Sequence, residues 1–495
     1  MAIRNIFQKF GTKLFLCLFM VTAGDWLLYG QPIGWALGLY GGLVAALLLL
    51  TQKNILQSRA SKVTAFIAAS LLGRLIYSPD LLTAVMYILA IITLLILSKR
   101  QQLLDAKLWS YDVGSFSSRL FTQWFLDKSC IQKLSKARGI KLNNIARYAV
   151  LPLLMALTFI YLFTQANPIL ASMLKKVDLT FIGSPGRWIF WVLTGFSVWA
   201  LLRPRFKLST EKSSVQFTRK IDFDLWLNKN AIIASLVVFN ILFAIQNAMD
   251  VAFLWTGAAL PAGMTYAKYV HAGAYPLIFT TIIAAIYVLI TFGDGSAKYQ
   301  SPAARVGVYL WIVQNIFLVI SAMSRTVNYI EFYSLTQLRT AGLIWMGLIA
   351  AGIFLMVLRI YLRKSNTWLL NANTLLLFTT LYICCFVNFN RMIADFNVAH
   401  AREVAEGSTG TYLDLQYMRE LGPEAIPALA RYQSKMATPQ PVLSELQANL
   451  RADLAENWRA WTWRKQLLLE EIVSSDATPI AEAIPPSVDP NSRYK

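Results

Sequence analysis

Charged residues are scarce in this chain. Only 15% of its 495 residues are Asp, Glu, Lys or Arg, whereas 56% are hydrophobic. Soluble domains carry charge on about a quarter of their residues, and disordered chains contain few apolar residues. The composition therefore excludes an ordinary soluble domain and a disordered chain, and it indicates a protein built mainly within a membrane.

Cysteine and histidine are also rare, with four and two residues respectively. Cys384 and Cys385 are adjacent, which is unlike the spacing of zinc ligands. We therefore expect no structural disulfide, no metal site and no cofactor. The sequence also lacks the phosphate-binding loop of ATP-driven pumps and the H-E-x-x-H and G-x-S-x-G motifs of zinc proteases and serine hydrolases. These absences argue against a primary ATP-driven pump and a zinc protease.

Long hydrophobic runs, in contrast, are abundant. A helix that crosses a bilayer needs about 20 mainly apolar residues. Eleven segments approach this requirement, so the sequence predicts an all-α, polytopic membrane helix bundle with a small extracytoplasmic C-terminal helical segment. The predicted spans are 14–30, 33–50, 63–78, 81–98, 148–166, 187–203, 231–249, 275–292, 306–324, 341–362 and 369–389.

The basic residues predict how these spans are oriented. With the N-terminus inside, the inner loops hold 28 Lys and Arg and the outer loops hold 6. Cytoplasmic loops of membrane proteins are enriched in these two residues. We therefore expect a cytoplasmic N-terminus and an outer C-terminal segment. The net charge of +20 is explained by these loops, so we expect no binding of nucleic acid.

Charge and hydrophobicity together divide the chain into five parts. Residues 391–495 hold 11 Lys and Arg against 14 Asp and Glu, unlike the basic remainder. Their Pro-, Ser- and Ala-rich end has the composition of a disordered tail. The predicted parts are a four-span membrane subdomain at 1–98, a cytoplasmic amphipathic loop at 99–147, a main membrane domain of about seven spans at 148–390 with a basic cytoplasmic loop at 203–230, a periplasmic or extracytoplasmic helical segment at 391–473, and a disordered tail at 474–495.

The loop 99–147 contains aromatic residues at helical spacing. Phe116, Leu120 and Trp124 recur every four residues, near the basic residues Arg119 and Lys128. This pattern predicts an amphipathic helix suited to the inner membrane surface. Such a helix either tiles the rim of the membrane domain or offers a docking surface.

Two ionisable residues, Asp25 and Arg74, lie within predicted spans. A charge at membrane depth is costly and needs a partner or water. Because their hairpins are neighbours in the sequence, we expect Asp25 and Arg74 to form a structural ion pair. A proton- or ion-coupled site is the alternative.

A second polar group belongs to the seventh predicted span. Asn240 and Asn247 share one helical face, and Asp250 follows Asn247 by about one turn. These side chains either line a polar cavity or form hydrogen bonds between helices. The candidate intramembrane polar residues are Asp25, Arg74, Asn240, Gln246, Asn247 and Asp250.

Small residues recur every four positions in the second predicted span, at Gly34, Gly38 and Gly42. Such a ridge lets two helix backbones approach closely in lipid. It predicts helix packing within the bundle, with the contact face of a homo-oligomer as the alternative.

The predicted outer loop 325–340 is the densest polar stretch of the membrane part. Arg325, Asn328, Glu331 and Arg339 form either an ion-pair network or a site for an anionic lipid headgroup, since arginine suits phosphate. His271, in another predicted outer loop, fits a hydrogen-bonded surface group better than a catalyst.

Three ordered patterns lie within residues 231–430. They are Tyr266-Ala-Lys-Tyr269, the stretch 328–339 around Ser334, and the stretch 388–429 around Asp414-Leu-Gln-Tyr417. Together they resemble a bacterial family known as domain of unknown function 4173, which is related to family 4153. The family usually has Gly where this chain has Ser334. The resemblance implies a polytopic bacterial membrane protein with an outer C-terminal helical segment, and it implies no activity.

The resemblance and the predicted topology place the chain in the bacterial cytoplasmic (inner) membrane, with its C-terminus in the periplasm or outside the cell. All three patterns fall on the outer side, so we expect them to meet at one outer surface. The candidate residues of this outer-face site are Tyr269, His271, Arg325, Asn328, Glu331, Arg339, Asn390, Arg391 and Asp414.

The missing catalytic motifs and the polar surfaces on both sides favour a non-enzymatic accessory or signal-relaying protein. Besides the lipid bilayer, we expect its partner to be a membrane or periplasmic protein, or a lipid bound at the outer face. A secondary transporter or lipid translocase is the first alternative, with Asp25, Arg74 and Asp250 as coupling groups. A transferase acting on a lipid-linked substrate is the second, and its candidate groups are His271, Glu331 and Asp414.

Overall fold

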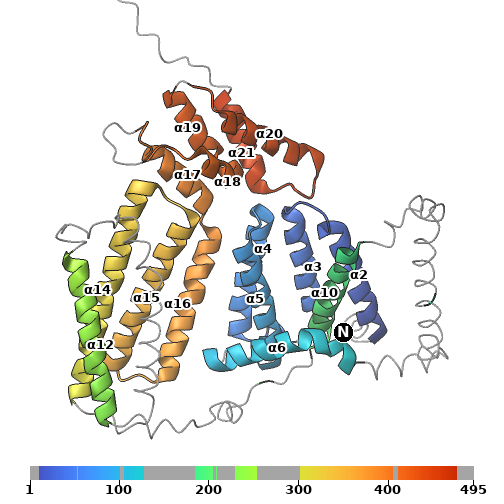
Figure 1. The fold of residues 1–495 in the computed structure, drawn as a ribbon. Helices are drawn as coiled ribbons and strands as arrows, with labels where there is room; N and C mark the ends of the chain where they lie inside the picture. Colours follow the sequence, from blue (N-terminus) through green and yellow to red (C-terminus); the bar gives the residue numbers. More distant parts are fainter. Residues whose placement is uncertain are drawn as a thin grey trace, which may run out of the picture. The chain divides into compact units, whose positions relative to one another are not determined.

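The chain forms helices throughout the part that the structure describes, and these helices form two compact units. The first unit comprises residues 1–104 and 108–210, and the second comprises residues 105–107 and 211–495 (Figure 1). The all-α fold class is confirmed for these described residues. The structure, a computed structural model, describes residues 10–52, 54–100, 105–127, 155, 184–204, 208, 229–252, 302–404, 411–436 and 438–476.

The first unit is built from apolar helices whose ends carry recognisable start signals. At one of them, Ser184 accepts a hydrogen bond from the amide of Arg187, and Pro185 begins the helix. Serine before the first turn and proline within it both favour helix initiation. The helices are α2 (Phe10–Leu28), α3 (Trp35–Thr51), α4 (Arg59–Tyr77), α5 (Leu81–Arg100), α6 (Ala106–Leu126) and α10 (Pro185–Leu202).

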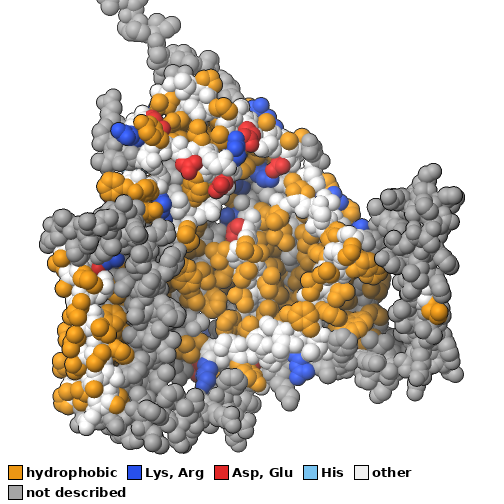
Figure 2. All heavy atoms as spheres, viewed as in Figure 1, with side chains coloured by type: hydrophobic (Ala, Val, Ile, Leu, Met, Phe, Trp, Pro, Cys, Tyr) orange, Lys and Arg blue, Asp and Glu red, His pale blue; other side chains and the backbone are white. Residues whose placement is uncertain are grey.

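The second unit contains long apolar helices followed by a group of shorter ones. The shorter helices α17–α21, hereafter the helical bundle, surround an apolar core in which Ile393, Met418 and Leu429 are fully buried. Charged side chains gather over this bundle (Figure 2). The helices are α12 (Lys229–Asp250), α14 (Pro302–Tyr333), α15 (Gln337–Tyr361), α16 (Asn366–Phe386), α17 (Phe389–Ala399), α18 (Leu415–Glu420), α19 (Ile426–Met436), α20 (Pro441–Glu456) and α21 (Trp463–Asp476), with a 3₁₀ turn, η5 (Gly422–Ala425).

Seven helices of the described residues are long and apolar enough to cross a membrane, namely α2, α4, α5, α12, α14, α15 and α16. Hydrophobic side chains cover the visible face of α12 (Figure 2), as contact with lipid chains requires. The predicted spans 33–50 and 187–203 coincide with the apolar helices α3 and α10. Apart from residue 155, the predicted spans 148–166 and 275–292, and the tail from residue 477, lie outside the described residues. The count of eleven therefore stays a prediction.

Asp25 lies near the end of α2 and faces α10. Its carboxylate accepts hydrogen bonds from Arg187 Nε (2.7 Å) and Trp191 Nε1 (2.8 Å). Arg74 lies instead 3.7 Å from Asp80, at the turn between α4 and α5. The predicted pairing of Asp25 with Arg74 is therefore wrong, because α2 packs against a helix that is distant in the sequence.

The helix α6 is tied to the ends of two apolar helices by buried aspartates. Asp112 lies 3.0 Å from Arg100, the last residue of α5. Asp127, just beyond α6, lies 3.2 Å from Arg203 and accepts a hydrogen bond from Trp199 Nε1 (3.1 Å). Both carboxylates are fully buried, so each depends on its arginine to offset the cost of losing water.

The glycine ridge of α3 faces α4. A Cβ atom added to Gly38 would lie 3.0 Å from the backbone nitrogen of Ile76, and one added to Gly42 would lie 3.8 Å from Leu72. Gly34 precedes α3 as its N-cap residue. At Gly38 the absence of a side chain thus allows the two backbones to approach, which places this glycine in packing within the unit.

The polar residues of the seventh predicted span form hydrogen bonds to α14. Asn240 donates to the carbonyl of Gly307 (2.9 Å) and accepts from Gln314 (2.9 Å), and Asn247 donates to the carbonyl of Gln314 (3.1 Å). Farther along, Asp250 forms a buried ion pair with Arg325. Gln246 Nε2 also donates to this aspartate, at 2.9 Å.

We predict that Asp127→Ala lowers the free energy of unfolding by about 3–5 kcal/mol, because removing one member of a buried pair leaves the other charge uncompensated. Asp80 accepts a hydrogen bond from the amide of Thr83 (2.8 Å) at the start of α5, so Asp80→Ala removes a helix cap and a half-exposed pair and should cost about 1 kcal/mol. Unfolding in mixed detergent and dodecyl sulfate micelles measures both. Equal losses would contradict the structural role of the Asp127 contact.

Candidate functional site

The turn between α14 and α15 has a strained residue at its centre. Ser334 has φ of +69°, a left-handed conformation that favours glycine. Arg339 donates to the carbonyl of Tyr333 (2.6 Å) and to that of Ser334, and it lies over the ring of Tyr329. Arg339 therefore closes the turn and does not point freely to a ligand.

Asn397 of α17 binds this turn through both atoms of its amide. Its Oδ1 accepts from the backbone N–H of Leu335 (2.7 Å), and its Nδ2 donates to the carbonyl of Leu335 (2.9 Å). Asn397 is only 4% exposed, so water cannot replace these bonds readily. These two hydrogen bonds between Asn397 and Leu335, hereafter the clamp, join the long helices α14 and α15 to the helical bundle.

Gln337, the first residue of α15, adds further bonds to the bundle. Its backbone N–H donates to the hydroxyl of Tyr417 (2.8 Å), and its side chain donates to Asn390 (2.6 Å). Asn390 in turn donates to the carbonyl of Leu421 (3.1 Å). These contacts, together with those of Asn397, fix the bundle to the α14–α15 turn at several separate points.

A groove of about 970 Å³ opens on the surface of the helical bundle. Its apolar side chains come mainly from α19, α20 and α21, and its polar side chains include two arginines and two acidic residues. The lining residues are Arg391, Asp395, Ile426, Pro427, Ala430, Arg431, Gln433, Ser434, Thr438, Pro439, Leu443, Gln447, Glu471 and Ile472.

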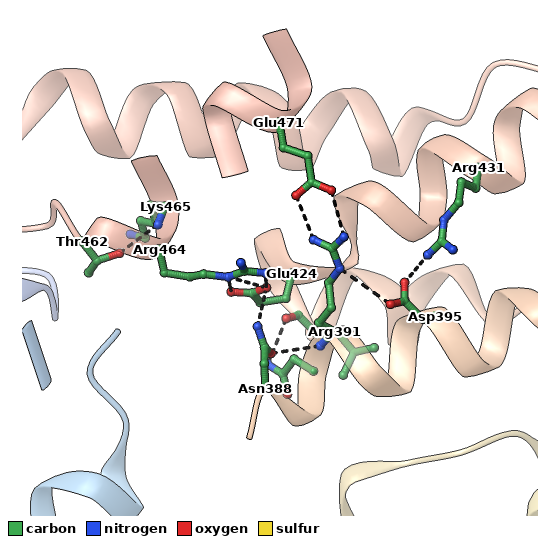
Figure 3. Close-up of polar contacts among 11 residues, drawn as sticks. Asn388, Arg391, Asp395, Glu424, Arg431, Thr462, Arg464, Lys465 and Glu471 are labelled. Atoms are coloured by element: carbon green, nitrogen blue, oxygen red, sulfur yellow. Dashed lines mark hydrogen bonds and ion pairs between the residues drawn. The ribbon is translucent and has the colours of Figure 1, made fainter. Parts of the chain in front are cut away.

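The four charged residues of the groove form a continuous row (Figure 3). Arg391 binds Glu471 through two hydrogen bonds of 3.0 and 2.8 Å, and its Nε lies 3.7 Å from Asp395. Asp395 also pairs with Arg431. The row alternates in sign and its formal charge is zero, so it offers both donors and acceptors without favouring a cation or an anion.

The Arg391 guanidinium lowers the pKa of Glu471 below its ordinary value by donating hydrogen bonds to the carboxylate. Glu471 therefore remains ionised at neutral pH and joins α21 to α17. Among the residues that the structure describes, no three His, Cys, Asp or Glu side chains lie close enough to hold a metal ion. The donors and acceptors of the charged row suit the groove to recognition by hydrogen bonds and ion pairs.

A second polar cluster lies where the chain leaves α16. Asn388 caps α17 by accepting from the amide of Arg391 (3.1 Å), and its Nδ2 donates to Glu424 (2.7 Å). Arg464 of α21 donates to the same carboxylate from Nε (3.0 Å) and Nη2 (2.8 Å) (Figure 3). Glu424 therefore connects the start of α17 to the start of α21.

The predicted outer-face residues occupy several places in the second unit. Arg325 pairs with Asp250, Asn328 and Glu331 lie on α14, and Asp414 caps α18 by accepting from the amide of Tyr417 (2.9 Å). Tyr269 and His271 lie outside the described residues. Of the predicted set, Arg339 and Asn390 belong to the turn and its contacts, and Arg391 lines the groove.

Several residues that build this site were not predicted as site residues. Asp395 follows Arg391 by one helical turn, a spacing that indicates a pair on one helix face. Asn397 lies within the pattern at 388–429 but carries no local sign of its partner. Arg431 and Glu471 reach the groove from other helices, and their spacing in the sequence gives no indication of this.

Most residues of these contacts lie in the part of the chain that matches one family model. The family model described as Domain of unknown function (DUF4153) matches residues 14–432. The chain belongs to this family. The expected family 4173 is a related but different one, so that part of the expectation is corrected. The DUF4153 match ends within α19, and α20 and α21 follow it. No curated protein and no solved structure matches the chain.

We predict that Asn397→Ala lowers the free energy of unfolding by about 2–4 kcal/mol, because two buried backbone groups of Leu335 lose their partner. Asn390→Ala, at a partly exposed position, should cost about 1 kcal/mol. Thermal unfolding in detergent, with proteolysis of the bundle as a second readout, compares them. A smaller effect for Asn397→Ala than for Asn390→Ala would contradict the clamp.

We also predict that acid loosens α21. Because the folded pKa of Glu471 is depressed, its stabilising contribution is complete above the ordinary glutamate pKa and is lost as the pH falls through the folded pKa. Hydrogen exchange of α21 amides, corrected for intrinsic rates, should rise on acidification. In Glu471→Gln this acid-dependent increase should be reduced, and an unchanged increase would refute the assignment.

Proposed function

We propose that this protein is a non-enzymatic accessory or signal-relaying component of the bacterial inner membrane. Its helical bundle lies on the outer side, and the groove binds a segment of a membrane or periplasmic protein. The observation that carries this proposal is the row of alternating charges at Arg391, Asp395, Arg431 and Glu471, set beside apolar side chains in an open groove.

The outer part of this charge row can exchange partners at small cost. The side chains of Arg431 and Asp395 are 59% and 38% exposed. Ion pairs between exposed side chains contribute only about 0–1 kcal/mol, so a bound segment carrying both signs of charge replaces them easily. Apolar contacts with Ile426 and Leu443 would then supply affinity, as they do at the centres of protein interfaces.

The attachment of the bundle supports a relaying role. The groove lies partly on α17, and the same helix holds Asn397, which binds the α14–α15 turn. A partner that shifts α17 would therefore act directly on two helices that are able to cross the membrane. This requires the turn to have two arrangements of similar free energy, as any two-state coupling does.

A secondary transporter or lipid translocase is the second candidate. It is favoured by the buried pair of Asp250 and Arg325 beside the hydrogen-bonded amides of α12 and α14. Buried ionisable groups within membrane helices commonly mark transport pathways. A proton or ion flux into proteoliposomes that Asp250→Asn abolishes would replace the binding proposal with this one.

Photo-crosslinking from the groove tests the binding proposal. A photoreactive residue at Ser434, which lines the groove, should give a discrete crosslinked product in native membranes, and Arg431→Glu should abolish it. Arg419→Glu is the matched control, because Arg419 is an exposed arginine of the same bundle that pairs with Glu445 away from the groove. Survival of the product in Arg431→Glu, or its absence throughout, would reject the groove as the binding site.

A further inference from the structure

The connection between α20 and α21 carries tryptophans on its surface. Trp458 and Trp463 are 44% and 56% exposed, although large aromatic side chains usually lose most of their contact with water. Trp461 packs against Trp463 with ring centroids 6.1 Å apart. These three tryptophans lie within six residues. The segment 457–465, which includes the first three residues of α21, is hereafter called the tryptophan loop.

The local fold of the tryptophan loop holds these rings outward. The side-chain oxygen of Asn457 accepts a hydrogen bond from the amide of Arg459 (2.9 Å). The backbone carbonyl of Asn457 accepts one from the amide of Ala460 (2.9 Å), and this bond closes a turn. Ala460 and Thr462 are buried, at 1% and 4% exposure. Because Ala460 and Thr462 are buried between the tryptophans, the exposure of Trp458 and Trp463 is built into the loop.

The loop lies next to the point where the chain leaves a membrane-spanning helix. The apolar helix α16 ends at Phe386, and Asn388 follows at the start of α17. Asn388 and Arg464 bind the same carboxylate of Glu424, at 2.7 and 2.8 Å (Figure 3). Arg464 directly follows Trp463, so the loop is held within a few side-chain lengths of the end of α16.

The tryptophan loop is basic. Residues 457–469 contain Arg459, Arg464 and Lys465 and no acidic residue, while Arg464 pairs with Glu424 and Lys465 pairs with Asp453. Arg459 lies over the ring of Trp458, 4.9 Å from its centroid. Tryptophan and basic residues gather at the boundary between lipid chains and water, where a ring needs both environments and phosphate attracts the cation.

We propose that the tryptophan loop is an interfacial anchor, which inserts Trp458 and Trp463 among the lipid headgroups of the membrane that α16 crosses. The partner is the lipid surface itself, because the end of α16 already places the loop at that level. The anchor adds a second attachment of the helical bundle to the membrane, besides the clamp at Asn397. It is independent of any partner bound in the groove.

Quenching by brominated lipids tests this proposal on the full-length protein in nanodiscs. Subtracting the tryptophan fluorescence of the variant Trp458→Phe/Trp463→Phe from that of the wild type gives the emission of these two rings alone. We expect this difference emission to be quenched most by lipids brominated near the headgroup and little by an aqueous quencher. Trp345→Phe is the matched control, since Trp345 is 50% exposed within the apolar helix α15 and should respond to deeper bromine atoms.

Three results would overturn the proposal. Quenching of the difference emission by aqueous iodide instead of bromolipid would place the rings in water. Insensitivity to both quenchers would place them against a protein, and strongest quenching by the deepest bromine atoms would place them in the lipid core. Trp458→Phe and Trp463→Phe measured singly keep the test available if the double variant does not fold.

Discussion

A carboxylate buried among the apolar helices needs a cation beside it, and this constraint governs the described membrane part. Asp112, Asp127 and Asp250 are fully buried, and each pairs with an arginine that lies within another helix or at the end of one. Because an uncompensated charge in such surroundings is costly, each pair fixes which helices are neighbours. Asp25 with Arg187 acts in the same way between α2 and α10.

In the helical bundle, ion pairs between the same residue types are exposed to water instead of buried. At Asp395 and Arg431 the ion pair faces water, so it contributes little to stability and is free to exchange. Buried amide contacts, above all that of Asn397 with Leu335, supply the rigid attachment instead. The division between fixed amides and exchangeable ion pairs is what allows a binding surface on a firmly attached bundle.

The sequence predicted the elements of the fold better than the contacts of the site. Hydrophobic runs of sufficient length located α2, α5, α12 and α14, because span formation depends on local composition alone. The partner of Asp25 was predicted wrongly, since proximity in sequence was taken for proximity in space.

The sequence by itself determined that this chain is helical, largely apolar and built for a membrane, because these properties follow from the periodicity and composition of short segments. Only the tertiary structure decided that Arg391, Arg431 and Glu471 share one groove, and that Asn397 closes on Leu335. Those contacts join residues 36 and 80 positions apart in the groove and 62 apart at the clamp. Their geometry depends on how whole helices pack, which no local pattern records.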